Sequence, residues 1–144
     1  MDPILAIVGP TATGKSALGM ALAGELGGEI VNADALQVYR GLDIGTAKPS
    51  PADRERVPHH LIDILEPSEA YSAGEFARRA HEAISGIRER GRVPIVVGGS
   101  GLYLRALLSG ISPIPPGDPA VRQELRESVS TLVALTLESV AAAA

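Results

Sequence analysis

The sequence predicts an α/β fold with a mostly parallel sheet. Short apolar runs alternate along the chain with longer segments of helical character, which is typical of strand–helix–strand units. A glycine-rich loop follows the first apolar run and opens the first helix, as in folds that bind phosphate. Of the 144 residues, 45% are hydrophobic and 21% charged, which is enough apolar material for one globular domain with its own core.

Four apolar runs are predicted to be strands, and they cover residues 4–8, 29–34, 60–65 and 93–99. Each is too short for a typical helix, and the first and last are continuous apolar runs bounded by Gly or Pro. Such runs are typical of strands that are buried on both faces of a parallel sheet.

Helices are expected over residues 15–26, 72–90 and 100–110, and from Asp118 onward. Ser72 and Glu75 match a capping box. Pro119 after Asp118 suits the first turn of a helix. Residues 35–41 are expected to hold a helical turn, and residues 42–58 are expected to form a long loop because Pro and Gly recur among polar residues.

Composition excludes several function classes. The chain has no cysteine, so it has no disulfide and no thiolate metal site. It has no apolar window of membrane-spanning length and no basic leader, so we expect a cytoplasmic protein without a membrane partner. The net charge of −4 argues against a generally basic surface, although a local basic patch could still bind nucleic acid.

Residues 9–16, GPTATGKS, satisfy the pattern G-x-x-x-x-G-K-[ST] between a strand and a helix. Glycine allows close backbone approaches, so that successive N–H groups can point into one concavity that binds anionic oxygens. Lys15 adds a positive charge, and the hydroxyl of Ser16 is a candidate ligand for Mg²⁺. The predicted phosphate-binding residues are Gly9, Pro10, Thr11, Ala12, Thr13, Gly14, Lys15 and Ser16. The bland alternative is a glycine-rich turn with a chance lysine.

Asp34 ends the second predicted strand, at the edge where parallel sheets place functional groups. It has three interpretations: a general base near the phosphate, a cap for the following turn, or a carboxylate ligand of Mg²⁺. The stretch VVGGS (96–100) has no aspartate, so the usual second carboxylate of an ATPase or GTPase is missing there.

Several stretches together resemble one family. GPTATGKS, NADALQVYRGLDIGTAKP, PHHLIDILEP, YSAGEFARRA and PIVVGGSGLYLRALLSG are similar to the bacterial tRNA dimethylallyltransferases, also called tRNA isopentenyltransferases, over residues 4–127. The resemblance implies an incomplete three-layer fold like that of P-loop NTPases in residues 1–115. It implies the start of a helical tRNA-binding region in residues 116–144, which end in an atypical tail.

The resemblance also implies an activity. A monomer would use Mg²⁺ and transfer a dimethylallyl group from dimethylallyl pyrophosphate to N6 of adenosine 37 in tRNA. Asp34 would be the general base, and Lys15 and Thr11 would act on the pyrophosphate. The tRNA-contacting positions implied are Asp34, Ala35, Leu36, Gln37, Ser100 and Arg122, and the metal position is Ser16.

The chain departs from the family pattern in three respects. Ala35 stands where the family has serine, and Ser100 stands where it has threonine. The chain is also shorter than family members, and the motifs predict that the resemblance ends near Glu127. Two alternatives remain at this point: a small-molecule P-loop kinase that binds ATP, and a non-catalytic phosphate-binding fragment of the transferase.

Overall fold

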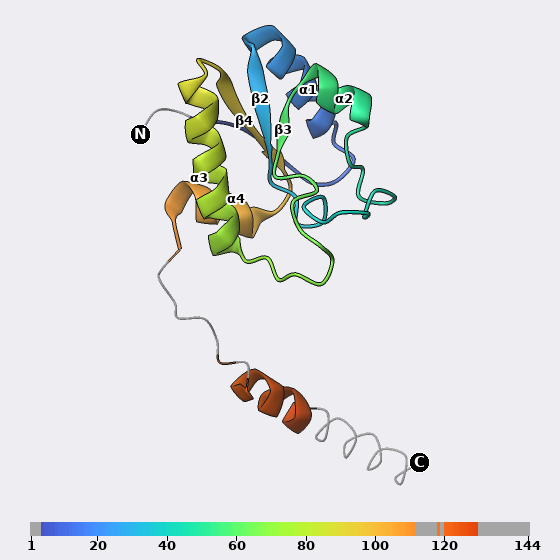
Figure 1. Cartoon of the computed structure of the whole chain (residues 1–144), viewed down its shortest axis with the longest axis vertical. Coiled ribbons are helices and arrows are strands. Elements are labelled where there is room, and N and C mark those ends of the chain that lie inside the picture. Colours follow the sequence, from blue (N-terminus) through green and yellow to red (C-terminus); the bar gives the residue numbers. More distant parts are fainter. Residues whose placement is uncertain (1–3, 112–117, 119, 130–144) are drawn as a thin grey trace. The chain divides into compact units, whose positions relative to one another are not determined.

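The computed structural model describes residues 4–111, 118 and 120–129 (Figure 1). The chain divides into two compact units, Met1–Ile111 and Ser112–Ala144. The first unit contains a parallel sheet whose described strands are ordered β1-β4-β2-β3. The strands are β1 Leu5–Val8, β2 Gly28–Asn32, β3 His59–His60 and β4 Val93–Gly98. The predicted α/β fold with a parallel sheet is confirmed.

Strand β4 lies between β1 and β2 and sets their register. Val8 is opposite Gly98 on one side of β4, and Asn32 is opposite Val97 on the other. Because all three strands run in the same direction, their carboxyl ends meet at one edge of the sheet. The loop after β1, the turn after β2 and the loop after β4 therefore come together there.

Helices cover both faces of the sheet (Figure 1). The described helices of this unit are α1 Lys15–Leu26, α2 Pro51–Arg56, α3 Ala73–Glu89 and α4 Gly101–Ser109, of which α2 buries none of its residues. Ile30 of β2 belongs to an apolar cluster with Ala23 of α1, whereas the next residue, Val31, belongs to a second cluster with α3 and α4. Successive strand residues point to opposite faces, so this alternation produces three layers, helix–sheet–helix.

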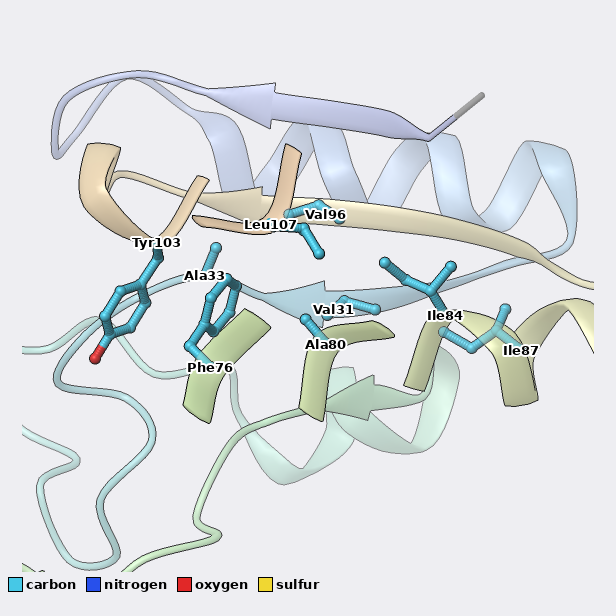
Figure 2. Close-up of a cluster of buried hydrophobic side chains, with 9 residues drawn as sticks. All are labelled: Val31, Ala33, Phe76, Ala80, Ile84, Ile87, Val96, Tyr103 and Leu107. Atoms are coloured by element: carbon cyan, nitrogen blue, oxygen red, sulfur yellow. The ribbon is translucent and has the colours of Figure 1, made fainter. Parts of the chain in front are cut away.

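The larger described core lies between the sheet and α3 (Figure 2). Phe76, Ile84 and Ile87 of α3 face the sheet, and each is at most 2% exposed. Phe76 also stacks on Tyr103 of α4, with 4.6 Å between the ring centroids. The start of α3 matches its prediction, because the Ser72 hydroxyl accepts the Glu75 N–H at 3.1 Å. Helix α4, which follows β4 in the chain, is thus packed against α3.

Two sequence-based expectations were wrong. The long loop expected over residues 42–58 contains α2, which begins at Pro51 and whose cap, Ser50, accepts the Asp53 N–H at 3.2 Å. Serine before proline, with an acidic residue in the first turn, is an ordinary helix start, but Pro and Gly around it hid the signal. Strand β3 has only two residues instead of six, because Leu61 (φ 63°) and Asp63 (φ 55°) turn the chain out of the sheet.

In the second unit, residues 120–129 are helical. Asp118 accepts the Ala120 N–H on its side chain at 2.8 Å and the Arg122 N–H on its carbonyl at 3.0 Å. The predicted helix start at Asp118 is confirmed, while Pro119 and the atypical tail after Val129 lie outside the described residues. No helix among the residues described has the length and apolar character needed to cross a membrane.

Candidate active site

The loop after β1 turns directly into the N-terminus of α1. Gly14 has φ 81°, in the left-handed region that favours glycine, and is the residue before the helix. The Thr13 hydroxyl donates to the Pro10 carbonyl at 2.9 Å, and the Lys15 ammonium donates to the same carbonyl. The loop therefore curls around Lys15, beside the helix end whose unpaired amides and dipole favour an anion.

A cavity of about 200 Å³ adjoins this loop. Its walls come from four segments that are distant in sequence: the loop after β1 with the first turn of α1, the end of β2 with the turn that follows, the loop before α2, and the end of β4. Its lining consists of residues 11–17, Asn32, Asp34, Gln37, Thr46, Ala47, Val97, Gly98 and Gly99. The cavity thus brings the loop and Asp34 onto one surface, as the sequence predicts for a phosphate with a nearby carboxylate.

Asp34 is half-buried and caps the turn over residues 35–38. Its Oδ1 accepts the N–H groups of Leu36 at 2.8 Å and of Gln37 at 3.2 Å. The capping interpretation is therefore confirmed. It leaves the base interpretation open, because Oδ2 makes no hydrogen bond within the described part of the chain and Asp34 lines the cavity.

Gln37 is held from two directions. Its backbone N–H is bound by Asp34, and its side-chain Nε2 donates to the carbonyls of Thr46 at 2.8 Å and Ala47 at 3.3 Å. The residue is 9% exposed and lines the cavity. Since two carbonyls take the donors of Nε2, the amide oxygen Oε1 is the atom left to accept a hydrogen bond.

Gly98 allows the end of β4 to approach the end of β2. A Cβ at this position would lie 2.3 Å from the carbonyl oxygen of Ala33, which is closer than any real contact. Ala33 also donates its N–H to the Val97 carbonyl at 2.8 Å, although it lies beyond the end of β2. Glycine at 98 therefore permits the approach that places Asp34 beside the loop after β1.

A second cavity of about 630 Å³ continues from the first. The two share the lining residues Ser16, Ala17, Asn32, Gln37, Ala47 and Val97. Met20, Ile30 and Ile62 give the larger cavity apolar walls, whereas Arg56 and His59 belong to its polar part. Burial lowers the pKa of His59, whose Nδ1 lies 2.7 Å from the Val57 carbonyl oxygen. The larger cavity is therefore suited to a partly apolar group.

The structure brings together part of the predicted site. Thr11, Ala12, Thr13, Gly14, Lys15, Ser16, Asp34 and Gln37 all line the smaller cavity, whereas Gly9, Pro10, Ala35, Leu36 and Ser100 do not. Ser100 is the residue before α4, but its side chain makes no capping hydrogen bond, so the alternative that its hydroxyl caps this helix is wrong. Arg122 belongs to the second unit.

Sequence reasoning missed several cavity residues, notably Asn32, Thr46, Ala47 and Gly99. Thr46 and Ala47 belong to the stretch DIGTAKP, which pointed to a family but suggested no contact. Their contribution comes from backbone carbonyls, which leave no residue-type signal. Asn32 was a findable candidate, because it is a polar residue at the carboxyl end of a buried strand.

Comparison with known proteins gives consistent results. The family model for IPP transferase matches residues 37–142. A tRNA dimethylallyltransferase from Halorhodospira halophila is 64% identical over 123 residues, which cover 85% of this chain and 40% of the relative. One from Anaeromyxobacter sp. (strain K) is 57% identical over 129 residues, which cover 90% of this chain and 42% of the relative.

Solved structures of the same family are also similar to this chain. A full-length tRNA isopentenylpyrophosphate transferase from Bacillus halodurans superposes with a TM-score of 0.76 at 45% identity, covering 91% of this chain and 44% of that one. A eukaryotic dimethylallyltransferase acting on tRNA gives a TM-score of 0.69 at 36% identity, covering 78% of this chain and 30% of that one.

The chain spans about two fifths of the length of the curated relatives it matches. The family match continues to residue 142, further than the end near Glu127 that the motifs predict. The matched region includes Asp118 and the helix after it, as well as Gln37 and the stretch DIGTAKP. The chain belongs to the IPP transferase family.

Proposed function

We propose that the protein transfers a dimethylallyl group from dimethylallyl pyrophosphate to N6 of adenosine 37 in tRNA. The observation that carries the proposal is one cavity lined by both Asp34 and the loop of residues 9–16, which we call the phosphate loop. Relatives and solved neighbours named as tRNA dimethylallyl- or isopentenylpyrophosphate transferases support it. One surface then serves the leaving group and the attacking nitrogen.

The phosphate loop would hold the leaving pyrophosphate. As the C–O bond breaks, its electron pair stays on the pyrophosphate oxygen, and negative charge grows there. The loop amides and Lys15 face that charge and stabilise it more strongly in the transition state than in the bound substrate. Thr11 lines the same cavity and would donate a hydrogen bond to a pyrophosphate oxygen.

The donor set of the cavity fits a magnesium ion bound mainly through the substrate. No group of three His, Asp or Glu residues that could hold a metal occurs among the residues the structure describes. Ser16 lines both cavities, and its hydroxyl would be an oxygen ligand of the kind that Mg²⁺ combines with phosphates and waters. When bound, the ion would neutralise charge on the leaving pyrophosphate.

Asp34 would take the proton from N6. The nitrogen forms a bond to the allylic carbon as the C–O bond breaks, and its excess proton passes to the free Oδ2 of Asp34. The target base must leave its stack to reach the cavity. Gln37 would contact the base, and the apolar walls formed by Met20, Ile30 and Ile62 would offer surface to the hydrocarbon part of the donor.

The remaining predicted contacts belong to this proposal. Ala35 and Leu36 lie exposed on the turn after Asp34, where a bound RNA could reach them. Ser100 and Arg122 would contact the tRNA, with residues 1–115 as the catalytic core and residues 116–144 as the start of the tRNA-binding region. We propose that the protein acts as a monomer in the cytoplasm.

The test uses labelled dimethylallyl pyrophosphate and a tRNA with adenosine at position 37. We expect transfer of label to the tRNA and calorimetric binding of pyrophosphate. Lys15→Met should weaken pyrophosphate binding roughly 10- to 100-fold, because a hydrogen bond to a charged group contributes about 1.5–3 kcal/mol. Arg78→Met is the control, because Arg78 lies on α3 and lines neither cavity.

Two results would contradict the proposal. Binding of ATP in preference to the prenyl pyrophosphate, with phosphoryl transfer to a metabolite, would indicate a kinase. Binding of pyrophosphate without any transfer to tRNA would indicate a phosphate-binding protein that does not catalyse the reaction.

A further inference from the structure

Lys48, the last but one residue of the stretch DIGTAKP, has a buried side chain. Its side chain is 2% exposed. The ammonium donates to the Tyr39 carbonyl at 2.9 Å and to carboxylate oxygens of Asp43 and Asp63 at 2.7 Å each. Three acceptors use all three N–H donors of an ammonium group. Lys48 therefore has no donor left for a ligand, and its contacts serve the protein itself.

The Lys48–Asp63 ion pair joins two segments with unusual backbone geometry. Ala47 has φ 51° and Asp63 has φ 55°, both in the left-handed region that non-glycine residues seldom adopt. Asp63 also binds Arg54 of α2 at 2.6 Å, and its backbone N–H donates to the Gln37 carbonyl at 3.2 Å. Such conformations persist where surrounding contacts impose them, and they concentrate at functional sites.

Charge on both partners is retained in the folded protein. Burial opposes ionisation of Asp63, but the hydrogen bonds from Lys48 and Arg54 outweigh it and lower the pKa of this carboxyl. Burial likewise acts against the Lys48 ammonium, yet Asp43 and Asp63 raise its pKa. Both partners therefore keep their charges at neutral pH, and their ion pair links the loop before α2 to the segment after β3.

The loop held by Lys48 is the one that orients Gln37. The carbonyls of Thr46 and Ala47, the two residues before Lys48, accept both hydrogen bonds from Gln37 Nε2. They fix the side-chain amide so that Oε1 is its available atom. If the loop moved, the amide could rotate and present a donor in place of an acceptor.

We infer that the Lys48–Asp63 ion pair is a positioning device for Gln37, which keeps its amide oxygen ready to accept an N–H from the base that receives the prenyl group. The inference rests on the proposed function. It assigns a role in acceptor recognition to Lys48, a residue that lines the larger cavity but that contacts only the protein through its charge. Because Oε1 of Gln37 accepts a hydrogen bond, it favours a base that has an amino group on its edge.

The kinetic test is Lys48→Met in the full chain, with the two substrates measured separately. We expect kcat/KM for tRNA to fall about 10- to 100-fold, because the Gln37 amide would no longer be held in the orientation that binds the base. The affinity for pyrophosphate should change less than about twofold, because the Lys48 ammonium binds Tyr39, Asp43 and Asp63, none of which belongs to the loop of residues 9–16. Lys48→Arg keeps the charge and should restore part of kcat/KM for tRNA.

The matched control is Arg78→Met, which also removes a cation paired with two carboxylates, Glu75 and Glu82, but on α3. It should leave both kcat/KM for tRNA and the affinity for pyrophosphate unchanged. The inference would be overturned if Lys48→Met left kcat/KM for tRNA unchanged. It would also be overturned if this substitution lowered kcat/KM for tRNA and the affinity for pyrophosphate by the same factor.

A readout independent of activity separates this inference from the proposed function. In the full chain, the side-chain amide protons of Gln37 should be shifted and slow to exchange by NMR, and this protection should be lost in Lys48→Met. If that variant does not fold, Asp63→Asn replaces it, because it keeps the side-chain shape while removing the charge. Absence of transfer by the wild-type chain would refute the proposed function; unchanged Gln37 amide signals in the variant would refute the positioning role.

Discussion

Asp34 combines a structural contact with a proposed chemical role in one carboxylate. Oδ1 holds the turn that carries Gln37, while Oδ2 is the oxygen proposed to take the proton. The two roles can be separated by substitution, because asparagine keeps an oxygen acceptor but cannot act as a carboxylate base.

Asp34→Asn should therefore lower the rate of prenyl transfer about 10²- to 10⁴-fold, the usual contribution of a general base. Its free energy of unfolding should stay close to that of the wild type. Asp34→Ala removes the cap as well and should lower the free energy of unfolding by about 1 kcal/mol. Rates from labelled donor and urea denaturation measure the two effects. Equal destabilisation by Asn and Ala would show that Oδ1 is not the stabilising contact.

For single residues, the sequence was sufficient where a short motif or the end of a strand marks the position. Thr11, Lys15 and Asp34 were predicted from a motif and from a strand end, and the structure places them on one cavity. Thr46 and Ala47 were not predicted as cavity residues, because they act through carbonyl groups that every residue possesses. Lys48 was also missed, because its three acceptors lie on segments up to fifteen residues away in sequence.

Among the elements, α3 carries much of the core between the sheet and α4. The capping box at Ser72 and Glu75 predicted where this helix begins, and the Ser72 hydroxyl does accept the Glu75 N–H. Elements with weaker signals were predicted less well: α2 has six residues and buries none of them, and β3 has only two residues. Short elements are held by tertiary contacts more than by their own sequence pattern.

Ile84→Ala in α3 should lower the free energy of unfolding by about 2–5 kcal/mol, because Ile84 is 2% exposed and the substitution leaves a cavity between α3 and the sheet. Urea denaturation would measure the change. Ser85→Ala, at the exposed neighbouring position, is the control and should change it by less than about 0.5 kcal/mol. Similar values for the two variants would contradict the packing seen in Figure 2.

At the scale of the whole first unit, Glu29 links sheet and helix layers. It lies in β2 with a side chain 5% exposed, and its Oε2 is 2.7 Å from both Arg90 Nη2, at the end of α3, and His60 Nε2, in β3. The hydrogen bond from Arg90 is the main cause that lowers the pKa of Glu29, with His60 contributing and burial opposing.

Stability should consequently depend on Glu29 in acid. Because the folded-state pKa is lowered from its ordinary value of 4.5, the unfolded chain takes up the proton first. The stabilising contribution is then present above that value and lost as the pH falls below it. Urea denaturation from about pH 6 to pH 3 should show a smaller pH dependence for Glu29→Gln than for the wild type.

The matched control for this pH dependence is Glu55→Gln, at an exposed position of α2. It should retain the wild-type dependence. If Glu29→Gln and the wild type lose stability in parallel over this range, Glu29 does not supply the pH-dependent term.

The sequence by itself determined the α/β class, the glycine-rich loop between the first strand and the first helix, and the family resemblance, because these depend on neighbours along the chain. A strand, a glycine-rich loop and a helix follow one another within residues 5–26, so local spacing is sufficient to predict them. Only the tertiary structure decided which groups share the cavity and how Gln37 is oriented. Strand order, the close approach at Gly98 and the Lys48–Asp63 ion pair join segments distant in sequence, and such contacts form only when the sheet register brings their backbones together.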